Sequence, residues 1–370
     1  MPELRIYATV WGLVEDAAGP FPLAKLPALC AKLKSLGYSG IEIPIAFVMK
    51  YGSSKFEALM RALDMTFIAQ VFSSGGPPTP GNLGIASEFG ISHPKDSADT
   101  RDVAAHKAVW GAQVHECARL RAVLQSVNSH TGKDYFTDAE SDDMLAHCVA
   151  LEKETGLVIN RASAPGALAA RFSAAAALLT SPHACAPSPC PPATPDETHR
   201  ARILYSPWQV PRVMAAHPAL HFTADLSHFS VVTETGADDP EVCKVVAQLT
   251  PRTRHVHARV GFPEGPQVPS VTGPLWAPLM EGYMAWWRGV YQAALGRGDA
   301  VVSTCPEFGP AAYAWVTAHA PLNPGRKDTL NNVWATNHHV GQEVCRLFAE
   351  LGGKAPTLAP DAEEGNWTLE

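Results

Sequence analysis

The sequence lacks the segments that would place it in or across a membrane. It has no run of 18 or more apolar residues, the length that a membrane-spanning helix needs. Its start, MPELRIYATVWG, has no basic segment followed by an apolar one, so no signal peptide is expected. We therefore expect a cytoplasmic protein with no membrane partner.

Basic charge is also scarce. The chain has 29 lysine and arginine residues against 36 aspartate and glutamate residues, a formal net charge of -7, and no long basic run. A protein that binds nucleic acid normally presents a basic face to the phosphates. No nucleic-acid partner is therefore expected.

The cysteines form no recognisable framework. Eight are scattered along the chain without a CxxC pair, at positions 30, 117, 148, 185, 190, 243, 305 and 345. Small secreted domains use regular cysteine spacings to build disulfides, and that class is excluded here. We expect reduced thiols that are mostly buried.

What the sequence does contain is a repeated alternation of short apolar runs and longer helical stretches. The predicted strands are 6–11, 40–45, 66–72, 124–129, 157–160, 221–225, 255–260 and 300–305. The predicted helices are 23–36, 56–63, 100–123, 139–155, 207–216, 239–249, 277–295 and 330–351. One helix has clear end signals, since Thr137 and Glu140 form a capping box and Gly156 is a stop.

This alternation predicts an α/β fold in which parallel strands are joined by helical crossovers. Eight units fit a closed barrel, and no GxGxxG turn follows the first strand as in a dinucleotide-binding sheet. We predict a single (β/α)8 TIM barrel over residues 1–356, followed by a flexible C-terminal tail over 357–370.

One segment breaks the alternation. Residues 161–196 consist largely of alanine, proline, serine and other small residues, with little charge. We interpret this segment as a low-complexity insertion in the fifth strand, disordered or loosely helical at the surface. Its composition suggests retained intronic sequence or a lineage-specific addition, and a spliced transcript lacking these codons would establish the former.

Four successive strand ends carry residue types that bind metals. They are Glu197, Asp225, His257 and Glu307. Active sites of barrels lie at the C-terminal ends of the strands, and charged groups buried there are costly unless they are paired. Each residue alone has an ordinary explanation as a solvated or packed side chain, but their succession favours a divalent cation in an oxygen-rich site.

Several segments resemble the xylose isomerase-like barrel superfamily, which includes sugar isomerases and epimerases related in fold to endonuclease IV. They are GYSGIEIP (37–44), VNSHTGKDYF (127–136), ETHR (197–200), ADLSHF (224–229), HVHARVGFPEGPQV (255–268) and PEFGP (306–310). The resemblance implies one divalent metal ion, Mn2+ or Mg2+ first and Co2+ or Zn2+ next, on the four ligands above. His257 is chosen over His255 because it lies nearer the end of its strand. The chain departs from the pattern at the insertion, because relatives run from the fifth strand almost directly into ETHR.

The resemblance further implies an isomerase or epimerase that acts on a sugar or polyol through a metal-stabilised enediolate. Glu197 and Glu307 would exchange the proton with carbon. The substrate would contact His228, His199, Arg259, His130, Glu42 and Trp11, although Glu42 and Arg259 could equally form structural ion pairs. Barrels of this kind often form homo-oligomers.

Other readings stay open. The same residues would suit a metal-dependent lyase or dehydratase of an inositol-like ketone, or a catalytically inactive metal-binding barrel. A phosphodiesterase of the endonuclease IV type would need more histidine ligands and a basic surface, and the sequence offers neither clearly.

Overall fold

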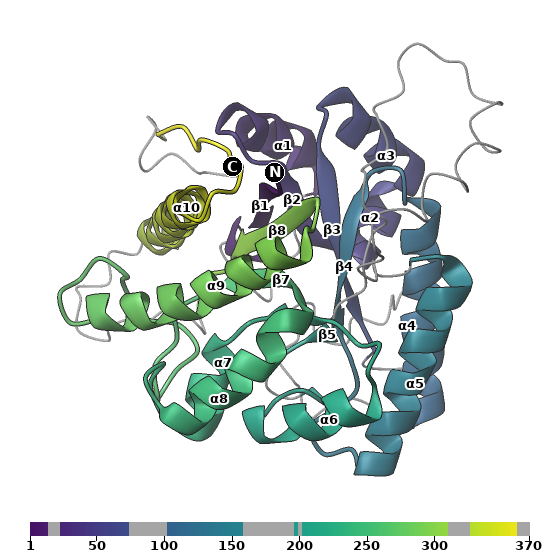
Figure 1. Cartoon of the computed structure of the whole chain (residues 1–370). Helices are drawn as coiled ribbons and strands as arrows, with labels where there is room; N and C mark the ends of the chain where they lie inside the picture. Colours follow the sequence, from purple (N-terminus) through teal and green to yellow (C-terminus); the bar gives the residue numbers. More distant parts are fainter. Residues whose placement is uncertain (14–22, 74–101, 158–195, 199–201, 310–325, 361–370) are drawn as a thin grey trace.

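Eight parallel strands close into a barrel in chain order (Figure 1). The computed structural model describes residues 1–13, 23–73, 102–157, 196–198, 202–309 and 326–360. The strands are β1 (Glu3–Thr9), β2 (Gly40–Pro44), β3 (Thr66–Phe72), β4 (Leu124–His130), β5 (Asp196–Glu197), β6 (Phe222–Ala224), β7 (Thr253–Ala258) and β8 (Val301–Pro306). β1 pairs with both β2 and β8, which closes the sheet and confirms the predicted (β/α)8 barrel.

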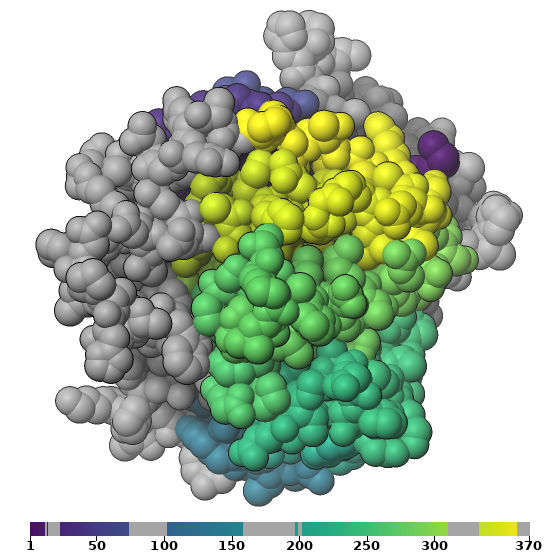
Figure 2. Space-filling model, turned by 90° about the vertical axis from the view of Figure 1, so that its left-hand side faces the viewer, coloured from purple at the N-terminus to yellow at the C-terminus, as the bar shows by residue number. Residues whose placement is uncertain are grey.

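Helices surround this barrel. They are α1 (Leu26–Ser35), α2 (Ile45–Tyr51), α3 (Ser53–Ala62), α4 (Val103–Arg119), α5 (Asp138–Thr155), α6 (Val210–Ala216), α7 (Ser227–Thr233), α8 (Pro240–Leu249), α9 (Ala277–Arg297) and α10 (Arg326–Glu350). On the face seen in Figure 2, α9 in green and α10 in yellow lie side by side. Among the helices described, none combines the length and the apolar character needed to cross a membrane.

Alternation along the strands divides apolar from polar side chains. In β2, Ile41 and Ile43 belong to the large core between the barrel and its helices, whereas Glu42 points into the barrel. Tyr7 and Cys305 form part of a smaller buried cluster of their own. Because successive residues of a strand face opposite sides, inward polar residues on several strands can meet inside the barrel.

The predicted capping box of α5 is confirmed. Thr137 Oγ1 accepts a hydrogen bond from the backbone N–H of Glu140 at 3.3 Å, and the Glu140 carboxylate accepts from the N–H of Thr137 at 2.7 Å. Gly156 ends the helix with a φ of 70°, a left-handed conformation that glycine adopts without steric cost.

The fifth strand is described only after the low-complexity segment. β5 consists of Asp196 and Glu197, so Asp196 belongs to the barrel and the predicted insertion is wrong at its last residue. Leu157 is buried, and the rest of the predicted strand and insertion (158–195) lies outside the described residues.

Two short helices, α2 and α7, were not predicted. At the C-terminal end, Leu358 is buried and Ala359 donates its N–H to the carbonyl of Leu36 at 3.0 Å, so residues 357–360 pack on the barrel. Residues 361–370 of the predicted tail lie outside the described residues, and the division into barrel and tail stays a prediction.

Six cysteines fall within the described residues, and all six are free thiols. Five of them are buried, and burial raises the pKa of the Cys30 thiol to about 12. Cys185 and Cys190 lie outside the described residues.

Candidate metal centre

The four predicted ligands meet at the C-terminal ends of neighbouring strands. Glu197 ends β5, Asp225 follows β6, His257 lies in β7 and Glu307 follows β8. All four are buried, and each offers one ligand atom such that these atoms lie within 4.8 Å of one another. This arrangement could hold a metal ion, and the ligand role of each residue stays a prediction.

The contacts between His257 and the carboxylates suit a shared cation. His257 Nδ1 lies 2.8 Å from Glu307 Oε2 and 3.5 Å from Glu197 Oε1. Among the described residues, neither His257 Nδ1 nor Glu307 Oε2 has a partner aligned for a hydrogen bond. Buried polar atoms are rarely left in this state. A divalent cation bound by three carboxylates and one imidazole would satisfy them, so the residues present fit the predicted ion.

Arg259 supplies positive charge to the same cluster. It follows β7, its side chain is 1% exposed, and its guanidinium forms an ion pair with Asp225. It also lies 3.6 Å from Glu307 Oε2, and its Nε donates to Ser227 Oγ at 3.1 Å. A divalent cation together with Arg259 would therefore balance the charges of the three carboxylates.

The pKa values show how strongly these groups interact. Burial raises the pKa of Asp225 and raises that of Glu307 to about 7, although Arg259 and His257 act in the opposite direction on both. Burial alone would lower the pKa of His257, but the carboxylates of Glu307, Glu42 and Glu197 raise it well above its usual value. Without a cation the cluster therefore tends to hold protons, which a bound metal ion would displace.

Neighbouring polar side chains hold two of the predicted ligands in place. Thr198 Oγ1 donates to the carbonyl of Asp225 and accepts from its N–H, both at 3.0 Å. Glu197 Oε2 accepts from Asn128 Nδ2 at 2.6 Å and lies 3.1 Å from His130 Nε2. Asn128 and His130 of β4 thus orient the Glu197 carboxylate, and Thr198 fixes the backbone of Asp225.

Two amide side chains hold the backbone that follows Glu307. Asn337, from α10, accepts from the N–H of Phe308 at 2.7 Å and donates to its carbonyl at 2.9 Å. Gln267 does the same for Gly309, at 2.7 Å and 3.1 Å. Each amide satisfies both backbone groups of one residue, so the position of Glu307 depends on α10 and on the segment after β7.

The predicted substrate-binding residues lie in different surroundings. His228 Nε2 is 2.8 Å from an Arg259 nitrogen and 3.4 Å from Asp225 Oδ2. The Trp11 ring centroid lies 5.5 Å from the Arg259 guanidinium carbon, close enough for a cation–π contact. Thus His228, Arg259 and Trp11 form one group beside Asp225.

The other three predicted contacts differ from that group. The His130 ring stacks on Phe72 with 4.3 Å between ring centroids, beside Glu197. His199 lies outside the described residues. Glu42 is fully buried in the barrel interior and contacts His255 and His257.

Two residues of the site were not predicted, Asn128 and Gln70, which both donate to Glu42 Oε1. Asn128 could have been found, because it lies two residues before His130 on one strand and therefore shares its face. Gln70 gave no such signal, since its role depends on how β3 packs beside β2.

Comparison with known proteins finds no matching family model and no matching curated protein. Solved structures are similar to the chain over most of its length. One is a xylose isomerase domain protein from Alicyclobacillus acidocaldarius, with 15% identity, a TM-score of 0.45, and coverage of 95% of this chain and 99% of that one. A D-allulose 3-epimerase from Methylomonas sp. has 11% identity and a TM-score of 0.48, with 91% and 92% covered. A probable 3-DHS dehydratase from Bacillus anthracis has 12% identity and a TM-score of 0.44, with 84% and 94% covered.

The solved structures to which the chain is similar thus include a xylose isomerase domain protein and a sugar epimerase, while the closed barrel itself is established by the order of its strands. At these identities the likeness concerns the fold alone. What the site does has to be argued from its own residues.

Proposed function

We propose that this protein is a divalent-metal-dependent isomerase or epimerase that acts on a sugar or polyol. The observation that carries the proposal is the meeting of Glu197, Asp225, His257 and Glu307 at the C-terminal ends of four successive strands. This is the end of a barrel at which active sites are built. The oxygen-rich ligand set favours Mn2+ or Mg2+. When bound, the cation would supply the positive charge that polarises a substrate carbonyl.

The two glutamates would move the proton. One carboxylate removes a proton from the carbon beside the carbonyl, and the other carboxyl group returns a proton. Return to the opposite face of that carbon gives the epimer, and return to the former carbonyl carbon gives the isomer. Both carboxylates are buried at the C-terminal end of the barrel, the end at which substrates bind.

Arg259 and His228 would bind substrate oxygen atoms. Both are buried and lie beside Asp225. Buried donors of this kind fix the orientation of a bound molecule, and they stabilise negative charge more strongly than exposed donors do.

The first test is the metal content of the purified protein, measured by elemental analysis beside Glu307→Gln. The proposal expects about one Mn or Mg per chain and a large loss in the variant, because the substitution removes one charged ligand. Glu57→Gln is the matched control, since Glu57 pairs with Arg61 on the surface of α3. The absence of metal from the wild type, even after soaking with Mn2+, would contradict the proposal.

Turnover is tested by incubating the Mn2+-loaded protein with a panel of ketoses in deuterated water. Isomerase or epimerase activity predicts deuterium at the carbon beside the carbonyl together with the product sugar. Loss of water from an inositol-like ketone added to the panel would identify the dehydratase instead. A protein that binds metal but exchanges no proton would be a metal-binding barrel without turnover.

A further inference from the structure

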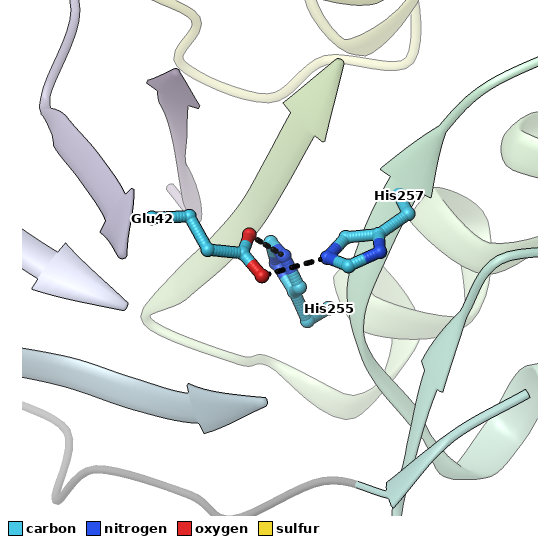
Figure 3. Close-up of side chains that lie close together, drawn as sticks. All are labelled: Glu42, His255 and His257. Atoms are coloured by element: carbon cyan, nitrogen blue, oxygen red, sulfur yellow. Dashed lines mark hydrogen bonds and ion pairs between the residues drawn. The ribbon is translucent and has the colours of Figure 1, made fainter. Parts of the chain in front are cut away.

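Beneath the candidate metal centre lies a second buried cluster, formed by Glu42 of β2 and two histidines of β7 (Figure 3). The carboxylate of Glu42 reaches between the two rings. Glu42 Oε1 is 2.9 Å from His257 Nε2, and Oε2 is 3.2 Å from His255 Nε2. All three side chains are fully buried, so their polar atoms depend on one another.

Hydrogen bonding accounts for this cluster without a second cation. Besides the contact with His257, Glu42 Oε1 accepts from Asn128 Nδ2 at 3.0 Å and from Gln70 Nε2 at 3.1 Å. A carboxylate oxygen has about two lone pairs, and the amides of Asn128 and Gln70 already supply two donors to this one. The cluster is therefore an acceptor surrounded by donors and leaves no coordination site on Oε1.

The two nitrogens of His257 face different groups. Nε2 faces Glu42, and Nδ1 faces Glu307 and Glu197. A neutral imidazole carries a proton on one nitrogen and a lone pair on the other. If Nε2 donates its proton to Glu42, the lone pair on Nδ1 is directed at the two carboxylates that would share the cation.

We propose that Glu42 is a positioning residue that keeps the proton of His257 on Nε2 and so leaves Nδ1 to the cation. This inference rests on the proposed metal site and replaces direct substrate contact as the role of Glu42. Carboxylates that accept from the second nitrogen of a histidine ligand orient the ring and raise its basicity.

Asn128 extends this role to a second ligand. Its Nδ2 donates both to Glu42 Oε1, at 3.0 Å, and to Glu197 Oε2, at 2.6 Å. One amide group thereby sets the separation between the positioning carboxylate and a ligand carboxylate. Glu42 is held from β4 and β7 at once, which is what a fixed orientation of His257 requires.

The experiment compares Mn2+ binding, by titration calorimetry of the full chain, in the wild type and three variants. Glu42→Ala removes the acceptor, and we expect its Kd for Mn2+ to rise about 10- to 100-fold, the usual effect of losing such a partner. Glu42→Gln keeps a carbonyl oxygen that can accept from Nε2, so it should restore most of the affinity. His255→Gln is the matched control, because it disturbs the same buried cluster at Oε2 and leaves the contact with His257 in place.

The outcomes separate this inference from the proposed function. A wild type that binds no Mn2+ overturns both. A wild type that binds Mn2+ while Glu42→Ala binds equally tightly overturns only the role of Glu42. Equal losses in Glu42→Ala and His255→Gln also overturn it, since they would mean that any disturbance of the cluster weakens binding.

A measurement on the unaltered protein covers the case in which Glu42→Ala fails to fold. Nitrogen NMR of the Zn2+-loaded wild type, with labelled histidine, reports which ring nitrogen carries the proton. The inference expects His257 to hold its proton on Nε2 and to have the shift of a metal-bound nitrogen at Nδ1. A proton on Nδ1, or metal bound through Nε2, would contradict it.

Discussion

At the scale of single residues, Arg259 carries the charge that the buried carboxylates need when no cation is present. It is 1% exposed and pairs with Asp225. We predict that Arg259→Gln lowers the free energy of unfolding of the metal-free protein by about 3–5 kcal/mol, because removing one member of a buried pair leaves the other uncompensated. Urea unfolding in the presence of a chelator measures this.

The control is Arg61→Gln, which breaks an exposed pair with Glu57. Such pairs contribute about 0.3–0.5 kcal/mol. If Arg259→Gln costs no more than this control, the guanidinium is not what balances the carboxylates.

A second residue, His221, predicts a pH dependence away from the metal centre. Burial, together with the nearby Arg254 and Arg252, lowers its pKa from 6.5 to about 3. Because the folded pKa lies below the unfolded one, the unfolded chain binds a proton first as the pH falls. The contribution of neutral His221 to the free energy of unfolding is fully present above pH 6.5. It declines as the pH falls from about 6.5 to about 3.

The variant His221→Gln should therefore lose stability less steeply than the wild type over that range. Urea unfolding at several pH values between 7 and 4 provides the comparison. Parallel curves for the two proteins would show that His221 titrates alike in the folded and unfolded chains.

At the scale of elements, seven of the eight strands lie close to their predicted positions because apolar runs bounded by turns define them. The helices α2 and α7 could not be found in this way. Each has seven residues, and α7 contains Val231, Val232 and Thr233, which favour strands. Helices this short are stabilised by packing rather than by local propensity. The predicted fifth strand lies almost wholly outside the described residues, and β5 is described only at Asp196 and Glu197, after the low-complexity segment.

The end of β8 leads to a prediction about two glycines. A Cβ at Gly309 would lie 2.2 Å from the Trp11 ring, and the backbone of Gly309 is held by Gln267. Gly309→Ala should destabilise the protein by about 1–3 kcal/mol, since the ring has to move. Gly296, in α9, has no atom within 4 Å of its would-be Cβ. Gly296→Ala should stabilise by up to about 1 kcal/mol through helix propensity.

Thermal unfolding of the two alanine variants tests this contrast. A Gly309→Ala protein as stable as the wild type would mean that Trp11 can move at little cost. Its contact with the Arg259 guanidinium would then be of minor importance.

At the scale of the whole molecule, the meeting of Glu197, Asp225, His257 and Glu307 was predictable because each lies at or just after a strand end, and parallel strands bring such ends to one face. The support beneath them was not predictable. Glu42 of β2 and Asn128 of β4 meet His257 of β7 only because the barrel closes, and Gln70 of β3 contacts Glu42. Sequence order gives the neighbours of a strand, but contacts across the interior depend on the register of every pair around the ring.

The same topology predicts that metal binding stabilises the barrel as a whole. The predicted ligands lie in or just after β5, β6, β7 and β8, and within the described residues β5 pairs with β4 only through Ser129 and Asp196. A cation that joins Glu197 to ligands on three other strands would reinforce this short strand. At a free Mn2+ concentration of 100 times Kd, binding to the folded state alone adds about 2.7 kcal/mol to the free energy of unfolding.

Thermal unfolding with Mn2+ and with excess chelator measures this gain in stability. Hydrogen exchange should also slow at the amides of Glu197 and Thr198 when Mn2+ is bound. Glu307→Gln, at the same Mn2+ concentration, should gain much less. An equal gain in this variant would place the stabilising metal ion somewhere other than the four strand ends.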